Sequence, residues 1–249
     1  YYIHGAELPE PDLACRTDAF DPADPQDTNG DGWFTMLDWA DIGDEDPRVA
    51  LPRVSCDPRV SDTNANGLID PQDLIVAFSD GLDDDGNGYP DDISGWDFFG
   101  GDNDANDDTD FGHGSGEAND STAAGNNARG SIGVCPLCRV LMVRVADSFV
   151  AESNDFAQGV AFAVDSGAAV IQEALGAITN STLAKQSIEY AYVNDVVVIA
   201  SAADEDSIHQ NYPGSNEHTV YTHAIVFDSL DSEHATTYLD FNNCSYYGP

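Results

Sequence analysis

One histidine of this chain lies in a setting that could support acid–base chemistry. His113 is flanked by Gly112 and Gly114 and follows the carboxylate-rich stretch 107–110. A neutral imidazole can take a proton from a weakly nucleophilic hydroxyl and return it to a leaving group, provided that a carboxylate fixes its tautomer. A lone histidine is more often structural or merely exposed, but the other five histidines have no comparable setting. His113 is therefore the candidate general base.

Three acidic segments upstream of this histidine have the spacing of loops that bind calcium. In residues 27–38, oxygen-bearing side chains stand at loop positions 1, 3, 5, 9 and 12, with glycine at position 6 and a backbone carbonyl at position 7. Residues 62–73 repeat this pattern, and residues 83–94 begin a third loop. Position 12 of the third loop is Ser94, so its last ligand must come from elsewhere in the chain.

Asn, Asp and Gly also favour plain turns, which is the simpler explanation of these segments. Because residues 27–38 and 62–73 have the same spacing of oxygen-bearing side chains, calcium binding is the better explanation, since calcium prefers hard oxygen ligands. We expect structural rather than sensor sites, in which the cation offsets the repulsion between carboxylates. The expected ligands are Asp27, Asn29, Asp31, Trp33 and Asp38 in the first loop, Asp62, Asn64, Asn66, Leu68 and Asp73 in the second, and Asp83, Asp85, Asn87, Tyr89 and Asp91 in the third, with backbone carbonyls at Trp33, Leu68 and Tyr89.

The charge of the chain excludes some classes of partner. It has 46 acidic and 8 basic residues, for a formal net charge of −38, and 29 of the acids lie in residues 1–110. Nucleic acid and anionic membranes are poor partners for such a surface. No apolar run approaches the roughly 18 residues that a membrane-spanning helix needs. We therefore expect neither kind of binding, and adaptation to salt is a second explanation of the acidity.

A different pattern begins near residue 130 and predicts alternating strands and helices. One helix should be capped by Ser153 and ended by Gly167, with an apolar face of Phe156, Val160 and Val164. Another should be capped by Ser181, with an apolar face of Leu183, Ile188, Ala191 and Tyr192. Mostly continuous apolar runs between them are typical of strands that are buried on both faces. This order predicts an α/β domain with a parallel sheet and crossover helices. The expected strands are 140–145, 168–175, 196–202 and 219–227.

Together these features resemble the subtilisin-like serine peptidases, or subtilases. In that family a calcium loop and a Gly-Trp-Asp-Phe run precede the catalytic histidine, and residues 80–98 resemble them. Residues 170–176 resemble the strand whose edge pairs with substrate main chain, and residues 196–204 the strand that ends in Ala-Gly-Asn. Residues 211–214 resemble the family's Tyr-Pro-Ala turn. The Asp that ends the first two acidic loops also resembles dockerin-type calcium repeats.

The resemblance covers about residues 74–249 and implies a three-layer α/β/α fold with a mainly parallel sheet. Residues 1–73 would then be an acidic insertion with EF-hand-like calcium loops. It also implies that His113 is the general base of a Ser-His-Asp triad, and that Leu175 and Gly176 lie along the main chain of a peptide substrate. The aspartate and serine of the triad have no match here, so we expect them outside this fragment, which alone should not hydrolyse peptides.

Asp204 stands at the position of the family's oxyanion-hole asparagine. Removing that amide from a subtilisin-type site costs about 3–4 kcal/mol of transition-state stabilisation. An ionised Asp204 would repel the oxyanion, whereas a protonated one could donate a hydrogen bond if its pKa were raised. Two hypotheses stay open: an enzyme that prefers lower pH, or a weakened family member that keeps a binding role.

Five cysteines, an odd number, fit a secreted protein whose sequence is cut before the last disulfide partner. Cys15 and Cys56 bracket the first loop and can pair, and Cys135 and Cys138 can form a short-range disulfide, which leaves Cys244. The resemblance then predicts a secreted, monomeric, calcium-stabilised endopeptidase that acts on proteins or peptides. The alternatives are a non-catalytic pseudopeptidase and a calcium-binding adhesion module built on the first two loops.

Overall fold

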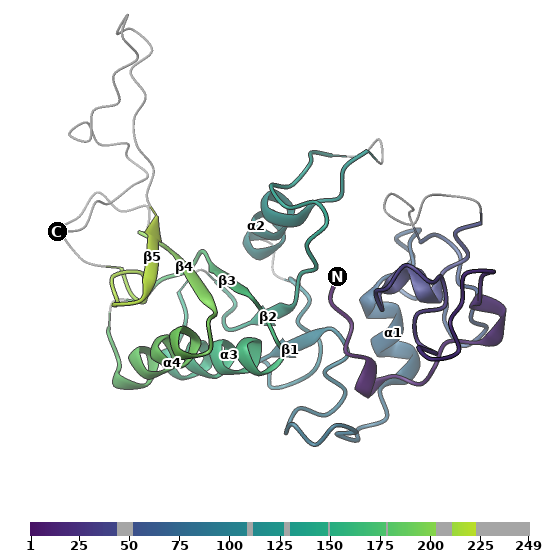
Figure 1. Cartoon of the computed structure of the whole chain (residues 1–249). Coiled ribbons are helices and arrows are strands. Elements are labelled where there is room, and N and C mark those ends of the chain that lie inside the picture. The colour runs from purple at the N-terminus through teal and green to yellow at the C-terminus, as the bar shows by residue number, and fades with distance from the viewer. Residues whose placement is uncertain are drawn as a thin grey trace, which may run out of the picture. The chain divides into compact units, whose positions relative to one another are not determined.

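The computed structural model describes residues 1–43, 52–108, 112–126, 130–148, 150–177, 179–202 and 211–222. Asp204 and Cys244 lie outside these ranges. The chain forms two compact units, Tyr1–Arg144 and Val145–Pro249, and each is described by itself (Figure 1). The expected boundary after residue 73, between the acidic segment and the rest, stays a prediction. No helix within the described ranges combines the length and the apolar composition that crossing a bilayer requires.

The first unit consists mainly of loops tied to short elements. Its strands β1 and β2 pair in parallel, with Trp96 opposite Val143. The described 3-10 helices are Gly5–Glu7 (η1), Leu13–Cys15 (η2) and Met36–Trp39 (η3), the α-helices are Pro71–Phe78 (α1) and His113–Thr122 (α2), and the strands are Gly95–Asp97 (β1) and Met142–Arg144 (β2).

The first two acidic loops each lead into a helix that the loop itself caps. Thr35, at position 9 of the first loop, caps η3, and Asp38 at position 12 accepts a hydrogen bond from the N–H of Thr35. Asp70 and Asp73 form the same capping box at the start of α1. Such a box satisfies N–H groups that a helix start otherwise leaves without partners. The repeated spacing in the sequence is therefore a repeated loop–helix unit.

A small apolar core and one disulfide hold these loops. The apolar residues at position 8 of the first two loops, Phe34 and Ile69, both belong to this core. Trp39 and Leu74, from the helices that follow, are fully buried in it. The disulfide Cys15–Cys56 joins residues 41 positions apart, as the sequence predicted. The core and the disulfide thus hold together the two loop–helix units and the segments around Cys15 and Cys56, although the unit has little regular structure.

The second unit is a parallel sheet with helices packed on it. The strands have the order β3-β4-β5, and all neighbours are parallel. Figure 1 shows both helices together on one side of these strands. The α/β arrangement expected from the sequence is confirmed. The helices are Ser153–Asp165 (α3) and Thr182–Val193 (α4), and the strands are Val170–Glu173 (β3), Val197–Ser201 (β4) and Thr219–Thr222 (β5).

The core of the second unit follows the predicted faces with small differences. Phe156, Val160 and Val164 of α3 are buried against α4, as the spacing predicted. On α4 the predicted face included Leu183 and Tyr192, which are instead 45% and 54% exposed. The buried face is that of residues 184, 187, 188 and 191, which follow one another at helical spacing.

The cap of α4 agrees with the sequence prediction, whereas the cap of α3 and the pairing of the strand predicted at 140–145 differ from it. Ser181 caps α4 by accepting the N–H of Ala184, as predicted. The N-cap of α3 is Glu152 rather than Ser153, and it makes no side-chain cap. The strand predicted at 140–145 forms as β2 but pairs with β1 instead of joining β3-β4-β5. Gly95 permits this pairing, because a Cβ there would collide with the carbonyl group of Met142.

Candidate active site

His113 is the first residue of α2, and the preceding glycine sets how the chain enters the helix. Gly112 is the N-cap residue and has a φ of 65°, a conformation that side chains disfavour. The His113 side chain is 36% exposed, and its Nε2 lies 3.7 Å from Oε1 of Glu117, one turn further along. The structure therefore presents the imidazole at the N-terminal end of a helix, with a carboxylate beside it.

Hydrogen bonds and ion pairs tie the acidic stretch before α2 to the strands. Asp107 accepts the N–H of Ser115, in the first turn of α2, at 3.0 Å. Nη1 of Arg144 on β2 lies 2.9 Å from Asp108 and 3.2 Å from the buried carboxylate of Asp97 on β1. Because Asp97 and Arg144 are themselves fixed by strand pairing, the strands position the segment that leads to His113.

The predicted substrate edge lies at the carboxyl end of β3. The carbonyl of Gly176 accepts the N–H of Ala151 at 3.3 Å, and that of Leu175 accepts the side-chain amide of Asn211 at 3.2 Å. A Cβ on Gly176 would meet the end of the Asn211 side chain, so a larger residue here would displace that amide from the carbonyls of Leu175 and Ser201. A peptide strand that paired with this edge would share or replace the bond from Ala151.

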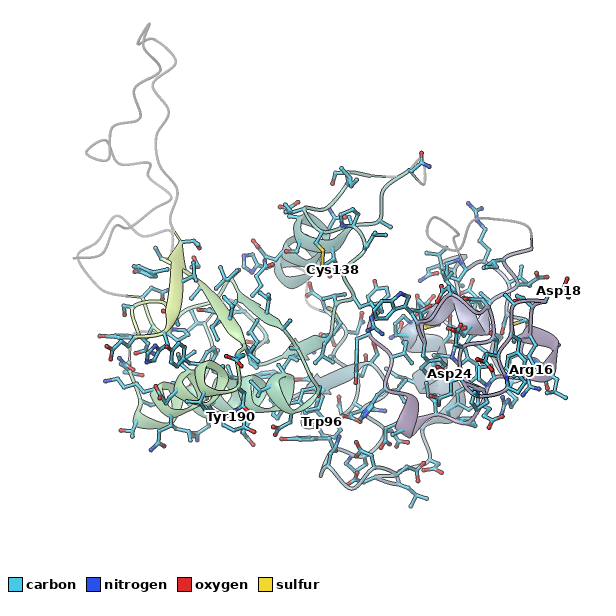
Figure 2. The ribbon with its side chains drawn as sticks, in the orientation of Figure 1. Arg16, Asp18, Asp24, Trp96, Cys138 and Tyr190 are labelled. Atoms are coloured by element: carbon cyan, nitrogen blue, oxygen red, sulfur yellow. A yellow bond between two sulfur atoms is a disulfide. The ribbon has the colours of Figure 1, made fainter. Side chains whose placement is uncertain are left out.

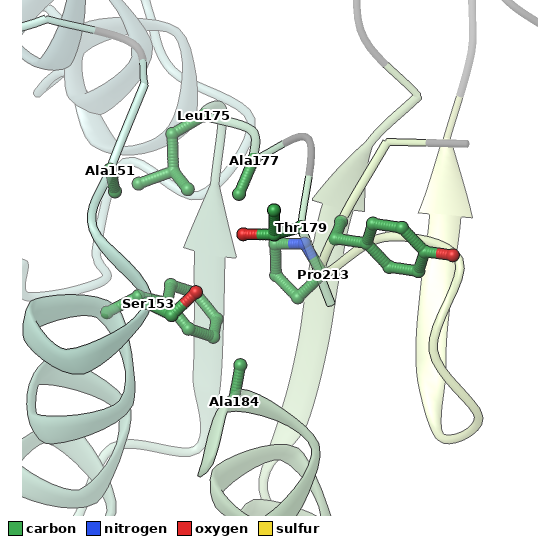
Figure 3. Close-up of a pocket in the computed structure, with 9 residues that line it drawn as sticks. Ala151, Ser153, Leu175, Ala177, Thr179, Ala184 and Pro213 are labelled. Atoms are coloured by element: carbon green, nitrogen blue, oxygen red, sulfur yellow. The ribbon is translucent and has the colours of Figure 1, made fainter. Parts of the chain in front are cut away.

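A small hollow opens beside Leu175. Figure 3 shows Leu175 and Ala177 from the end of β3 facing Ser153 at the start of α3 and Ala184 on α4. Its lining is almost entirely apolar, with Phe156 among the contributing side chains. A lining of this kind favours contact with an apolar side chain.

A buried acid next to this edge has no counterpart in the sequence expectations. Glu173 ends β3, is 6% exposed, and accepts the N–H of Leu175 through Oε2 at 3.3 Å. Its Oε1 is buried without a hydrogen-bond partner among the described residues. Burial raises the pKa of this carboxyl to about 9, against the smaller opposing effect of the Leu175 N–H. Glu173 is therefore protonated at neutral pH.

The first two acidic loops have the internal hydrogen bonds of closed turns. Asp27 accepts the N–H groups of Gly30 and Gly32 at 2.8 and 2.7 Å, and Asp62 accepts that of Gly67 at 2.9 Å. The carboxylates at position 12 are fully buried, and burial raises the pKa of Asp38 to about 7, against opposing backbone hydrogen bonds. The loops thus surround these carboxylate oxygens with backbone N–H groups.

The third loop brings in an acid that the spacing could not reveal. Glu7 on η1 is 4% exposed, and its carboxylate lies with those of Asp83 and Asp85 in a group whose oxygens are within 4.8 Å of one another. This is a candidate for the last ligand expected from elsewhere. Ser94 at position 12 instead donates its hydroxyl to the carbonyl of Tyr2.

Other members of the third loop have different partners. The Asp91 carboxylate accepts the N–H groups of Asp80 and Gly81 at 2.9 and 2.7 Å, so it closes a neighbouring turn. The ring of Tyr89 packs on that of Trp96 in β1, with centroids 5.2 Å apart. The loop is thereby attached to the strand that precedes the His113 segment.

The expected site residues fall in different parts of the structure. The fifteen expected metal ligands and His113 belong to the first unit, whereas Leu175 and Gly176 belong to the second. Asp204 follows the described end of β4 and lies outside the described residues. Its role stays a prediction.

Comparison with known proteins gives the chain a family. The subtilase family matches residues 55–247. Thermitase from Thermoactinomyces vulgaris is 34% identical over 140 residues, which are 56% of this chain and 48% of thermitase. A thermophilic serine proteinase from Bacillus sp. strain AK1 is 34% identical over 112 residues, which are 44% of this chain and 28% of that protein.

Solved structures have more distant similarity. Sphericase is 23% identical with a TM-score of 0.42, covering 47% of this chain and 40% of that one. The chain spans about half or less of the length of the relatives it matches. The family match, by contrast, includes the second acidic loop and all the helices and strands described in the second unit. The chain therefore belongs to the subtilase family, and its parallel strands and helices are part of a subtilisin-like α/β fold.

Proposed function

We propose that this chain is part of a serine endopeptidase that cleaves peptide bonds with a Ser-His-Asp triad, and that His113 is the general base. The observation that carries the proposal is the place of His113 at the start of α2, directly after the acidic stretch that Arg144 ties to the strands. Membership of the subtilase family and similarity to a serine proteinase support it.

The chemistry assigns His113 two steps. Its neutral imidazole removes the proton of the serine hydroxyl during attack and then gives it to the leaving amine. Nε2 is the atom that faces the serine in such a triad, and Glu117 lies on that side of the ring. The Glu117 carboxylate would have to swing away, which its exposed position permits, when serine and substrate approach.

The substrate would be a peptide that adds a strand along Leu175 and Gly176. Main-chain pairing gives affinity in such an arrangement, and side-chain pockets give preference. An apolar side chain of the substrate would lie against the apolar surface beside Leu175. Ser153, Thr179 and Tyr212 are the hydroxyl-bearing residues of the lining.

Calcium would be held by the three acidic loops in a structural role. The donor set fits, because carboxylates and amide oxygens are the ligands that calcium takes in proteins, and Glu7, Asp83 and Asp85 already converge. When bound, the cation would supply positive charge that offsets the repulsion among these acids. The loops contribute little apolar surface, so this compensation would be a main source of their stability.

The covalent crosslinks support export from the cell. Two disulfides, Cys15–Cys56 and Cys135–Cys138, are formed in the structure. Disulfides persist in oxidising, extracellular compartments. We therefore infer that the peptidase is secreted, and we propose that it acts on proteins or peptides as a monomer.

A non-catalytic role is the second candidate function. Asp204 favours it, because an ionised carboxylate at the oxyanion-hole position would repel the oxyanion. Replacing Asp204 by Asn should raise kcat in the full-length protein and flatten its decline at neutral pH, since an amide donates to the oxyanion without needing a proton. An unchanged rate and pH profile would remove Asp204 from the mechanism.

The test of the main proposal is kinetic. His113→Ala in the full-length protein should reduce kcat for peptide hydrolysis by about 10⁴–10⁶, because no other group can take the serine proton. His218→Ala is the matched control, since His218 stacks on Tyr192 at the surface of the second unit. If His113→Ala and His218→Ala had the same small effect, His113 would not be the base.

A further inference from the structure

The helix that carries His113 is too weak to hold the imidazole in place by itself. α2 has ten residues, no buried side chain, and glycines at positions 114 and 116. Isolated helices shorter than about 12–15 residues are marginal in water, and interior glycines weaken them further. Contacts at the two ends of α2 must therefore supply its order.

One short segment caps the C-terminal end of α2. The N–H of Val134 donates to the carbonyl of Asp120 at 3.0 Å. The N–H of the next residue, Cys135, donates to the carbonyl of Ser121 at 2.8 Å. The last carbonyls of a helix have no partner within it. These amides supply that partner from outside the helix.

Gly133 allows the capping segment to approach so closely. It is buried, and its N–H donates to the carbonyl of Ala123 at 2.9 Å. A Cβ at this position would collide with the backbone of Thr122 and Ala123. Three consecutive amides, 133–135, are thus aimed at the end of α2.

The Cys135–Cys138 disulfide fixes the shape of this segment. The N–H of Cys138 donates to the carbonyl of Cys135 at 3.0 Å, which closes a tight turn with proline in its second position. The apolar side chains around the turn point into solvent: Val134 is 94% exposed and Leu137 is 76% exposed. Side-chain packing therefore contributes little, and the crosslink keeps the amides aligned. Figure 2 shows the sulfur–sulfur bond at Cys138 beside α2.

We propose that the Cys135–Cys138 turn is a positioning element for His113. The crosslink holds amides 133–135 against α2, and α2 in turn fixes the imidazole. A dithiol reductant would convert the disulfide to two cysteine thiols while it becomes a cyclic disulfide itself. The freed turn would let the C-terminal end of α2 fray. The effect on α2 stands on the geometry alone, whereas its catalytic consequence rests on the proposed function.

Hydrogen exchange of the full-length protein tests the effect on the helix. Cys138 is exposed while Cys15 of the other disulfide is 8% exposed, so mild dithiothreitol should open the turn first, and mass mapping verifies this. Reduction should speed exchange in residues 113–123 about tenfold, which is the order expected from opening a short crosslinked loop, and leave α3 unchanged. Val134→Ala, which keeps the backbone amide, is the matched control and should behave like the wild type.

A second measurement separates positioning from a purely structural role. Reduction should shift the NMR signals of the His113 imidazole and lower kcat about tenfold at constant KM, and reoxidation should restore both. Unchanged exchange in residues 113–123 after reduction would overturn the proposal, as would faster exchange with an unaltered His113 signal and kcat. A fully oxidised protein without peptidase activity would instead count against the proposed function, and the exchange and NMR results would still decide the role of the turn.

Discussion

Glu173 should make the second unit lose stability as pH rises. Its carboxyl is buried at the end of β3, and burial raises its pKa from an ordinary value of 4.5 to about 9. Lys185 is the only lysine or arginine after Arg144 in the sequence, and it is exposed. A counter-charge for an ionised Glu173 is therefore scarce in this unit, and the fold favours the protonated form.

The magnitude follows from the two pKa values. Because the folded-state pKa lies above that of the unfolded chain, the contribution to stability is complete below about pH 4.5 and is lost as pH rises through about 9. The slope of this one group is about 1.4 kcal/mol per pH unit. Over the whole window the loss amounts to about 6 kcal/mol as an upper value, since partial opening of the site would relieve it.

Hydrogen exchange of the β4 backbone amides, measured between pH 5 and 9, gives the free energy of the opening that exposes them. In Glu173→Gln, which stays neutral and keeps an acceptor for the Leu175 N–H, the decline with pH should be shallower by about 1.4 kcal/mol per unit. Glu217→Gln removes an exposed acid of the same unit and should leave the slope as it is in the wild type. Equal slopes for the wild type and Glu173→Gln would refute the reasoning.

The remaining predictions concern the acidic loops, the substrate edge and α2. Calcium chelation should make residues 1–92 sensitive to proteolysis before the second unit becomes sensitive. Glu7→Gln should weaken calcium binding, measured by calorimetry, about tenfold, whereas the control Glu10→Gln, at an exposed acid, should leave it unchanged. Equal calcium binding by both variants would exclude Glu7 as a ligand. Gly176→Ala should lower the free energy of unfolding by about 1–3 kcal/mol through the collision with Asn211. Gly116→Ala, which meets open space, should instead slow exchange in α2, and a destabilised Gly116→Ala would contradict this.

Local sequence signals predicted the elements that depend on neighbours in the chain. The apolar spacing of α3 and the Ser181 cap of α4 are both present in the structure. The pairing of Cys15 with Cys56 was also predictable, because the two cysteines bracket one loop. Such features need only a few consecutive residues or a simple enclosure, so sequence alone contains them.

Features that depend on distant contacts were beyond the sequence. Glu7 reaches the third loop from 78 residues before Asp85, whose N–H it accepts, and no spacing rule connects them. The pairing of β2 with β1 depends on the close approach that Gly95 permits. The apolar run that contains Glu173 gave no sign that this carboxyl would be buried, because an acid in such a run is equally compatible with an exposed edge.

The most direct test of the central claim is the labelling of the catalytic serine by a fluorophosphonate, which reacts only with a serine whose proton a base removes. The full-length wild type and His218→Ala should each acquire one label on a single serine, located by mass spectrometry, and His113→Ala should acquire none over the same time. Labelling of His113→Ala at the wild-type rate, or no labelling of the wild type, would contradict the assignment of His113 as the general base.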